Sequence, residues 1–496
     1  MENDSVDLCR KRRWQGRLIE TAWLLGLFVF LFIFFNCVHP LAIHDGDDWG
    51  YASFTRGALP IWKYWNPTRV LPEILSPLCV TLAGYVVMPF TGDFFTSITI
   101  CAAFMVSLMI TVYVFLVLRM LKRTCSLTVG KVTLICAVFL VFHFVIFRSQ
   151  QSENVHLFYS WNFNTYFYYT IPNLLNASLV MLWETSGGRE YLGDKDHVVR
   201  QGFVVLAGYL AIFSNLFSSY IIAVYAGVCL LEALPKLKWK RLYEWFRENA
   251  WALLVLTAWF VSAFYEINGV RSNYLGEESN GLSGLKQAAW NLVSRMKTLN
   301  TVFFRVCAVT VVLALLLLVH SRLRNEEDRH FARRFCRYLM CGVLSGFYLL
   351  LLCSGSMQGY IRRPDVIFGG GFFLIVAVIL SMAYVVRRMP RSVLILPLLL
   401  VVLIFESDTR VNTFCEPNLD GYSATKCNAI NQAIMNQILE AAEAGVSEAE
   451  IEVPEGPYWF ISDAMARAML NCGLIDHEIV GYDVEVEDFF ERYGIR

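Results

Sequence analysis

Long apolar segments recur along this chain and limit the folds that are open to it. They lie near residues 20–38, 94–118, 132–147, 166–183, 202–214, 217–232, 249–265, 301–320, 338–354, 366–386 and 392–405. A helix needs about 20 apolar residues to cross a bilayer, and several of these segments reach or approach that length. Only 17% of the residues are charged, whereas soluble domains carry about 25%. The sequence therefore predicts an all-α polytopic membrane protein with eleven transmembrane helices.

The distribution of basic residues predicts the topology. Basic loops are retained on the cytoplasmic side of a membrane, and here they lie near residues 10–17, 119–131, 236–247, 322–337 and 387–391. These loops share one side only if a further apolar segment, residues 71–90, does not cross. Pro72, Pro77 and Pro89 favour a broken, interfacial helix in that segment. We therefore predict a juxtamembrane helix over 71–90, a cytoplasmic N-terminus and an exported C-terminus in a multi-pass cell-membrane protein.

The C-terminal segment differs in composition from the rest of the chain. From Asp408 onward there are 17 acidic and five basic residues. Helical apolar spacing extends over 424–444 and 462–472, with a short strand at 450–453 between them. The sequence thus predicts a transmembrane domain over 1–406 and a small exported α/β domain over 407–496, with a lid or packing role favoured over a second enzyme. One pair among Cys415, Cys427 and Cys472 could form a disulfide, and their spacing is not that of a metal site.

The first exported loop, residues 39–93, opens with three carboxylates in four positions. Asp45, Asp47 and Asp48 precede Trp49, and ionisable groups held at a membrane face usually mark a pathway or a reaction site. The alternative is a solvated acidic turn that caps the following helix. As a reaction site, the loop offers Asp48 as the first candidate for a general base and Asp47 as the second carboxylate. Asp45 is expected to matter least.

Two aromatic segments carry groups suited to a sugar on a lipid phosphate. Trp65, Asn66 and Arg69 combine an aromatic ring, an amide and a planar guanidinium, and a guanidinium fork matches phosphate. A later segment contains the aromatic and amide side chains of Trp161, Asn164 and Tyr166. The alternative for both segments is an aromatic belt at the membrane surface.

Three further arginines lie on the exported side, against the positive-inside bias. They are Arg271, Arg362 and Arg363, and they are suited to a phosphate or diphosphate. Snorkelling to lipid headgroups, or pairing with the acidic C-terminal segment, is the alternative. The chain has no Walker-type loop and no dinucleotide-binding fingerprint, and we expect no nucleic-acid partner.

In plan and in these motifs the chain resembles the GT-C superfamily of polytopic membrane glycosyltransferases. Within it, the chain is most similar to bacterial integral-membrane glucosyltransferase-like families with an Asp-Asp-aromatic motif in the first loop, which 47–49 matches. Residues 65–69 resemble a Trp-Asn-x-x-Arg element, although Thr68 replaces a usual Gly. Residues 164–172 resemble an Asn-x-Tyr element before a Pro. Residues 269–271 resemble a Gly-x-x-Arg element with one residue fewer, and 489–495 resemble an aromatic-Tyr-Gly ending.

The resemblance implies a hexosyltransferase-like enzyme of the cell envelope. It would transfer a sugar, with inversion, from a polyprenyl-phosphate donor to an exported glycan or lipid-linked acceptor. The donor phosphate would lie near Arg69, Arg271, Arg362 and Arg363, and the sugar and acceptor near Trp49, Trp65, Asn66, Trp161, Asn164 and Tyr166.

The cofactor and two other functions stay open. Some members of the superfamily use a divalent metal such as Mg²⁺ or Mn²⁺ at the first-loop carboxylates, here Asp47 and Asp48, and others use none. A transporter or flippase of lipid-linked saccharides is the first alternative function, disfavoured by nearly charge-free spans and by the lack of an internal repeat. The second is a polymerase of such saccharides, which has no obvious need for an acidic first loop.

Overall fold

The structure is a computed structural model that describes residues 2–54, 68–148, 156–160, 162–186, 198–268, 281–323, 325–355, 357–407 and 421–495. A helix lies at each of the eleven apolar segments. In chain order they are α1 (Glu2–Ile33) with η1 (Phe34–Val38), α5 (Phe94–Cys125), α6 (Val129–Val145), η3 (Tyr166–Thr170) with α8 (Ile171–Ser186), α10 (Val198–Ile212), α11 (Leu216–Ala233), α13 (Ala250–Ile267), α16 (Thr301–Ser321), α17 (Glu326–Gly355), α18 (Pro364–Arg388) and α19 (Ile395–Ser407).

Within the described residues, eight helices are long and apolar enough to cross a membrane. Seven of them coincide with predicted spans, while α6, α10 and the helix at residues 390–405 are shorter apolar helices. The eighth is the helix at residues 70–91. The remaining predicted span, at η3 and α8, is in neither group. An all-α polytopic membrane protein is therefore confirmed for the helical part of the chain.

Helix α18 forms the centre of the helical bundle. Of its apolar stretch 83% is buried, against 11% for α16 at the periphery, and α18 contacts α5, α6, α8, α11, α16 and α17. A Cβ on Gly369 would lie 2.5 Å from the hydroxyl of Tyr220. Glycine at this position therefore lets α11 approach α18 closely.

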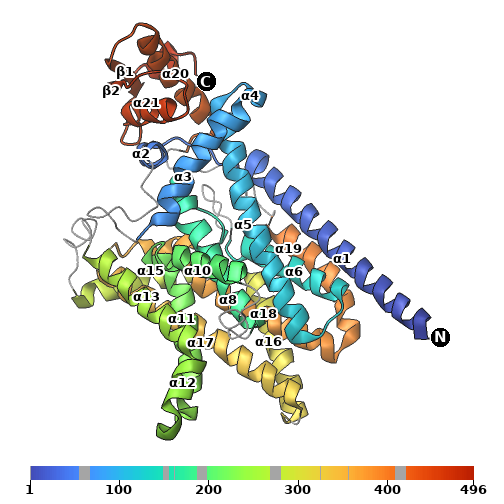
Figure 1. Cartoon of the computed structure of the whole chain (residues 1–496). Coiled ribbons are helices and arrows are strands. Elements are labelled where there is room, and N and C mark those ends of the chain that lie inside the picture. Colours follow the sequence, from blue (N-terminus) through green and yellow to red (C-terminus); the bar gives the residue numbers. More distant parts are fainter. Residues whose placement is uncertain are drawn as a thin grey trace.

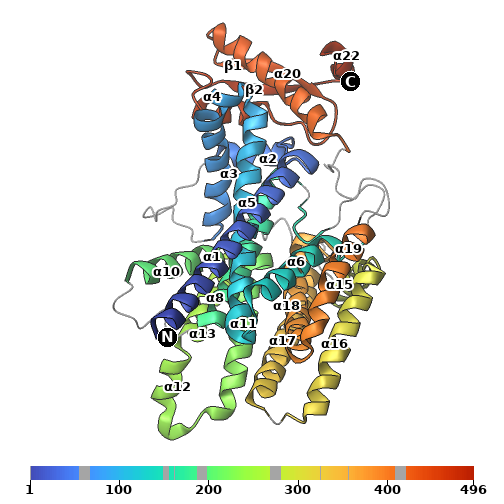
Figure 2. The ribbon, with the colours of Figure 1, turned by 90° about the vertical axis from the view of Figure 1, so that its right-hand side faces the viewer.

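Shorter elements connect these helices. They are α2 (Gly46–Ser53), α7 (Phe163–Thr165), η5 (Leu234–Lys236), η6 (Trp239–Arg241), α12 (Leu242–Glu248), α15 (Gly281–Met296), η7 (Tyr360–Arg362) and η8 (Pro390–Leu394). The long helix α1 runs beside α5 in both views of the molecule (Figure 1, Figure 2).

The segment predicted as a broken juxtamembrane helix is helical without a break. It consists of α3 (Val70–Leu82), η2 (Ala83–Val87) and α4 (Met88–Thr91). Pro72 lies in the first turn, where an N–H has no helical acceptor to lose. Pro89 lies in the first turn of α4, directly after a π-helical turn with a shifted bonding pattern. The third proline, Pro77, lies inside α3, and the helix continues on both sides of it. None of the three prolines ends the helix, and by length and composition it could cross a membrane.

Residues 421–495, here called the C-terminal unit, contain helices and a two-stranded parallel sheet. Their order is α20 (Ala424–Glu443), β1 (Glu448–Pro454), α21 (Ser462–Asn471), β2 (Val480–Val486) and α22 (Phe489–Arg492). The strands pair from Glu448 with Val480 to Pro454 with Val486, and α21 lies in the connection that parallel pairing requires. Helices α20 and α21 and strand β1 lie where the sequence predicts them, whereas β2 and α22 were not predicted.

The C-terminal unit lies at one end of the molecule, next to α2 and α4 (Figure 1). The N-terminal end of α1 and helix α12 lie far from it (Figure 2). The first-loop carboxylates are therefore placed between the helical bundle and the C-terminal unit.

Candidate functional site

The acidic turn forms the first turn of α2. Asp45 is the N-cap residue, and its Oδ1 accepts a hydrogen bond of 2.6 Å from the backbone N–H of Asp47. Carboxylates at a helix N-terminus satisfy free N–H groups and interact favourably with the helix dipole. The capping role that the sequence left as an alternative is thus real for Asp45. However, Asp45 is buried, with 4% of its surface exposed, and not solvated.

Asp48 lies one turn after Asp45 and is completely buried. Its Oδ1 accepts a hydrogen bond of 2.7 Å from the backbone N–H of Asn164, and its Oδ2 accepts one of 3.4 Å from the N–H of His44. Burial raises the pKa of Asp48 well above its usual value, and the charge of Asp45 raises it further, while the backbone N–H groups oppose both effects. Burial therefore favours the protonated form of Asp48, and its carboxyl group has no access to solvent.

The imidazole of His44 lies beside Asp48, with Nδ1 3.7 Å from Oδ2. Burial lowers the pKa of His44, and the charge of Asp45 opposes this shift only in part. The neutral imidazole is thus favoured, and His44 does not act as a cation that would keep Asp48 ionised.

Asp47 is the exposed member of the three carboxylates. Residues three apart on a helix share a face, so Asp45 and Asp48 both point into the protein. Asp47 is out of phase with them and points outward. The carboxylate that a substrate can reach on this helix is therefore Asp47, and the prediction of Asp48 as a direct proton acceptor does not fit its burial.

The aromatic and amide segment that contains Asn162, Asn164 and Tyr166 contacts the acidic turn directly. Asn162 Nδ2 donates a hydrogen bond of 2.9 Å to Asp45 Oδ2 and caps α7 together with Thr165. Asn164 supplies the backbone N–H that binds Asp48, and the hydroxyl of Tyr166 lies 3.0 Å from Nε2 of His39. Sequence reasoning did not select Asn162 or His39. An Asn three residues before a Thr is a helix-capping pattern that could have marked Asn162.

At its other side the same segment binds the start of α18. Ser160 donates a hydrogen bond of 3.1 Å to Asp365 Oδ2, and Asn173 donates one of 2.6 Å to the Asp365 carbonyl. Arg363 forms two hydrogen bonds with the Asp365 carboxylate, of 3.0 and 2.6 Å. The guanidinium also lies 4.6 Å from the centre of the Tyr169 ring. Residues 156–160 and 162–173 therefore join the acidic turn to the predicted arginine cluster.

The predicted phosphate ligands are mostly engaged or buried. Arg363 is only 5% exposed and is held by Asp365. The guanidinium of Arg69 binds Glu266 at the end of α13 through two hydrogen bonds, one of them 2.9 Å long. These two arginines therefore do not offer a free fork to a phosphate, because each already faces a carboxylate. Arg362 is exposed. Arg271 lies outside the described residues.

The predicted sugar-binding side chains that the structure describes are buried. Trp49 is fully buried, packs edge-on to Phe95 and donates through Nε1 to Asn431 Oδ1 at 3.3 Å. Its faces are therefore not open to a sugar. Asn164 and Tyr166 are buried as well. Trp65, Asn66 and Trp161 lie outside the described residues.

The C-terminal unit holds α2 in place. Asn431 Nδ2 donates to the Ile43 carbonyl at 2.6 Å, and the N–H of Gly46 donates to the Tyr458 carbonyl at 2.9 Å. Asn471 donates to the carbonyl of Ser53 at 2.8 Å. Both ends of α2 are thus bound to the C-terminal unit, which supports the packing role predicted for it. Cys427 and Cys472 are not joined to each other by a disulfide, and Cys415 lies outside the described residues.

Within the part of the chain that the structure describes, the carboxylates of the acidic turn do not gather the ligands of a metal site. Both oxygens of Asp48 face backbone N–H groups. Among the residues that the structure describes, no three His, Cys, Asp or Glu side chains lie close enough to hold one metal ion. A divalent cation normally needs several oxygen ligands together. The metal that the resemblance left open does not fit the described residues, so we assign no reaction step to it.

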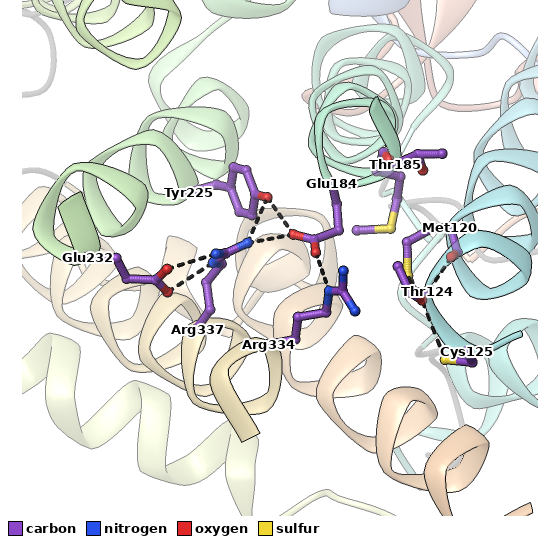
Figure 3. A network of polar contacts seen from close by, with 10 residues as sticks. Met120, Thr124, Cys125, Glu184, Thr185, Tyr225, Glu232, Arg334 and Arg337 are labelled. Atoms are coloured by element: carbon purple, nitrogen blue, oxygen red, sulfur yellow. Dashed lines mark hydrogen bonds and ion pairs between the residues drawn. The ribbon is translucent and has the colours of Figure 1, made fainter. Parts of the chain in front are cut away.

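A separate charged network lies where α8, α11 and α17 meet (Figure 3). Glu184 binds Arg334 and Arg337, each at 2.8 Å, and accepts a hydrogen bond of 2.6 Å from Tyr225. Arg337 also binds Glu232 at 2.7 Å. The helical bundle is therefore less free of charge than its apolar segments suggest. Each of these charges has a partner of opposite sign, as a structural network requires.

Comparison of the sequence with models of known protein families finds no match, and comparison with curated proteins finds none either.

Proposed function

We propose that this protein is an integral-membrane glycosyltransferase of the GT-C type. It is hexosyltransferase-like, takes its sugar from a polyprenyl-phosphate donor and transfers it to an exported glycan or lipid-linked acceptor. The proposal includes a cytoplasmic N-terminus and an exported C-terminal unit in a bacterial cell membrane. The observation that supports it is the direct contact between the acidic turn and the aromatic and amide segment that contains Asn162 and Asn164. Asn162 binds Asp45, and the N–H of residue 164 binds Asp48.

In the proposed reaction Asp47 is the general base. It is the exposed carboxylate of α2, whereas Asp48 fixes the helix against residue 164 and acts as a positioning residue. This exchanges the roles that the sequence gave to the two side chains. The hydroxyl proton passes to Asp47 while the acceptor oxygen bonds to the anomeric carbon.

The donor phosphate leaves as the new bond forms. The bond between the anomeric carbon and the phosphate oxygen breaks, and the phosphate keeps the electron pair. A positive group near that oxygen lowers the barrier by stabilising the developing charge. Arg362 is the exposed arginine next to the anchored Arg363 and Asp365 pair, and we assign this role to it.

The proposal is tested by donor consumption with purified protein. Radiolabelled polyprenyl-phosphate-glucose serves as the probe and a membrane glycolipid extract as the acceptor source. Asp47→Asn should reduce release of polyprenyl phosphate by about 10²–10⁴-fold, the range that general-base catalysis supplies. The matched control is Glu487→Gln, which neutralises an exposed carboxylate of the C-terminal unit and should keep full activity. Equal donor consumption by wild type and Asp47→Asn would reject Asp47 as the base.

A transporter or flippase is the second candidate, because charged side chains packed between transmembrane helices, here near their predicted cytoplasmic ends, often mark a transport route. The observation in its favour is the network of Glu184, Arg334 and Arg337. It would move a lipid-linked saccharide across liposomes that contain the protein without cleaving it. Movement of an intact fluorescent lipid-linked saccharide, with no release of polyprenyl phosphate, would favour this function over the transferase.

A further inference from the structure

A basic pocket lies between α1 and α5, at the end of the molecule far from the C-terminal unit. Its volume is about 440 Å³, which is within the range of roughly 300–1,000 Å³ typical of ligand pockets. Four cationic side chains line it together with one carboxylate: Arg17, Arg119, Lys122, Arg123 and Glu20. The pocket therefore carries an excess of positive charge.

The one carboxylate does not balance the pocket. Glu20 binds Lys122 at 2.5 Å, and Arg123 donates a hydrogen bond of 2.8 Å to the carbonyl of Thr185. Arg17 and Arg119 have no carboxylate within ion-pair distance among the described side chains. The guanidinium of Arg119 lies 5.6 Å from the centre of the Phe115 ring. Lys122 and Arg123 are therefore held by acceptors. Arg17 and Arg119 face no described carboxylate, and all four cations line the same cavity.

The position of the pocket favours a lipid over a soluble anion. The apolar stretch of α1 begins near Arg17, and Arg119 and Lys122 lie near the end of α5, so the charges lie at a membrane boundary. Thr21, Leu24 and Phe115 complete the lining. On the neighbouring outer surface of α1, Leu25 is 60% exposed. A phosphate can therefore bind the arginines while an acyl chain follows the apolar surface of the helix.

We propose that this pocket binds the phosphate headgroup of an anionic phospholipid. Snorkelling alone would explain cations at helix ends, but it would not explain why four of them converge on one cavity. Basic pockets between transmembrane helices are a known mode of headgroup recognition. This site is separate from the acidic turn and does not depend on the proposed glycosyltransferase activity.

The test is lipid binding to the purified full-length protein, measured by native mass spectrometry with phosphatidylglycerol and phosphatidylcholine as probes. Arg17→Gln combined with Arg119→Gln should weaken phosphatidylglycerol binding by roughly thirtyfold, as expected for two basic residues near an anionic lipid. The matched control is Lys238→Gln with Lys240→Gln, which removes two exposed cations elsewhere and should leave binding unchanged. Phosphatidylcholine should bind all variants weakly.

A change of the opposite sign separates ligand binding from a role in folding. Glu20→Gln removes the one negative charge of the pocket and should tighten phosphatidylglycerol binding, whereas damage to the fold would weaken it. The thermal midpoint of each variant is measured in parallel. Equal losses in the arginine and lysine pairs, or weaker binding by Glu20→Gln, would overturn the proposal. Full displacement of the lipid by inorganic phosphate would assign the site to a soluble anion instead.

Discussion

At the scale of single residues, α2 gives three identical side chains three different roles. Asp45 caps the helix, Asp47 is exposed and Asp48 is buried against the N–H of residue 164. The physical cause is the periodicity of the helix. Residues three apart, such as Asp45 and Asp48, share a face, whereas Asp47 lies on another face. Chemical identity within a motif therefore does not decide which member can meet a substrate.

The pH dependence of stability tests the state of Asp48. Burial raises its pKa in the folded protein above the value of about 3.9 in an unfolded chain. The protonated form therefore stabilises the fold, and this contribution is complete below the unfolded pKa and is lost as pH rises through the folded pKa. Asp48→Asn is neutral at every pH and should flatten this fall in the thermal midpoint as pH rises above about 4.

The control for this experiment is Asp47→Asn, which changes an exposed carboxylate on the same helix. It should leave the pH dependence of the midpoint close to that of wild type. A variant Asp48→Asn that loses stability chiefly at neutral pH would contradict the prediction, since it would mean that Asp48 is stabilising when ionised.

At the scale of elements, the C-terminal unit docks on two helices of the first loop. It binds both ends of α2 by hydrogen bonds to main-chain groups, and the end of α21 contacts η2. Directly after α21, the thiol of Cys472 donates to the carbonyl of Val80 in α3 at 3.5 Å. A Cβ on Gly84 would lie 2.8 Å from Cβ of Cys472. The absence of a side chain at Gly84 therefore permits the docked position.

Gly84→Ala should loosen this contact, because the Cβ of Cys472 cannot rotate away from the new methyl group. Overpacking of this kind typically costs about 1–3 kcal/mol. Burial raises the pKa of Cys472 to about 11, so its thiol should be unreactive in wild type and should react with a thiol reagent in Gly84→Ala. The measurement is the labelling rate of Cys472 together with the thermal midpoint.

Gly50→Ala is the matched control, since a Cβ at Gly50 meets nothing within 4 Å. Gly50 lies inside α2, where Ala is favoured over Gly by up to about 1 kcal/mol. This variant should keep Cys472 protected and should be at least as stable as wild type. Equal protection of Cys472 in both variants would contradict the role given to Gly84.

At the scale of the whole molecule, acidic and basic residues are concentrated at opposite ends. The acidic C-terminal unit lies at one end next to α4, while α12 lies at the far end (Figure 1, Figure 2). The basic segment 236–247 includes most of α12 and the residues just before it. Because basic segments favour the cytoplasmic side, we predict that α12 lies on that side and that α4 and the C-terminal unit both lie on the opposite side.

Labelling from outside the cell tests this topology. Single cysteines at Phe90→Cys, Ala444→Cys and Lys240→Cys occupy exposed positions in α4, the C-terminal unit and η6. In a background without other reactive thiols, the first two should react with an impermeant maleimide in intact cells. Lys240→Cys should react only after permeabilisation. A Phe90→Cys protein that labels like Lys240→Cys would place the helix at 70–91 across the membrane.

The sequence by itself determined the local structure of this protein. Apolar length and periodicity predicted a helix at all eleven segments, and stop signals placed the ends of α20 and α21 to within a residue. The apolar periodicity that marks a helix and the residues that end it can both be read over a few neighbouring positions. Information of that kind is therefore present in any short window of the chain.

Only the tertiary structure decided the candidate site. Asn162 and Asn164 reach the acidic turn from more than one hundred positions away, and Glu266 neutralises Arg69 from a distant helix. The sequence presented Arg69 and Arg363 as free cations and Trp49 as an open ring, because their neighbours in space are not their neighbours in the chain. Whether a charged side chain is available for chemistry depends on what packing places opposite it, and that is fixed only when the whole chain has folded.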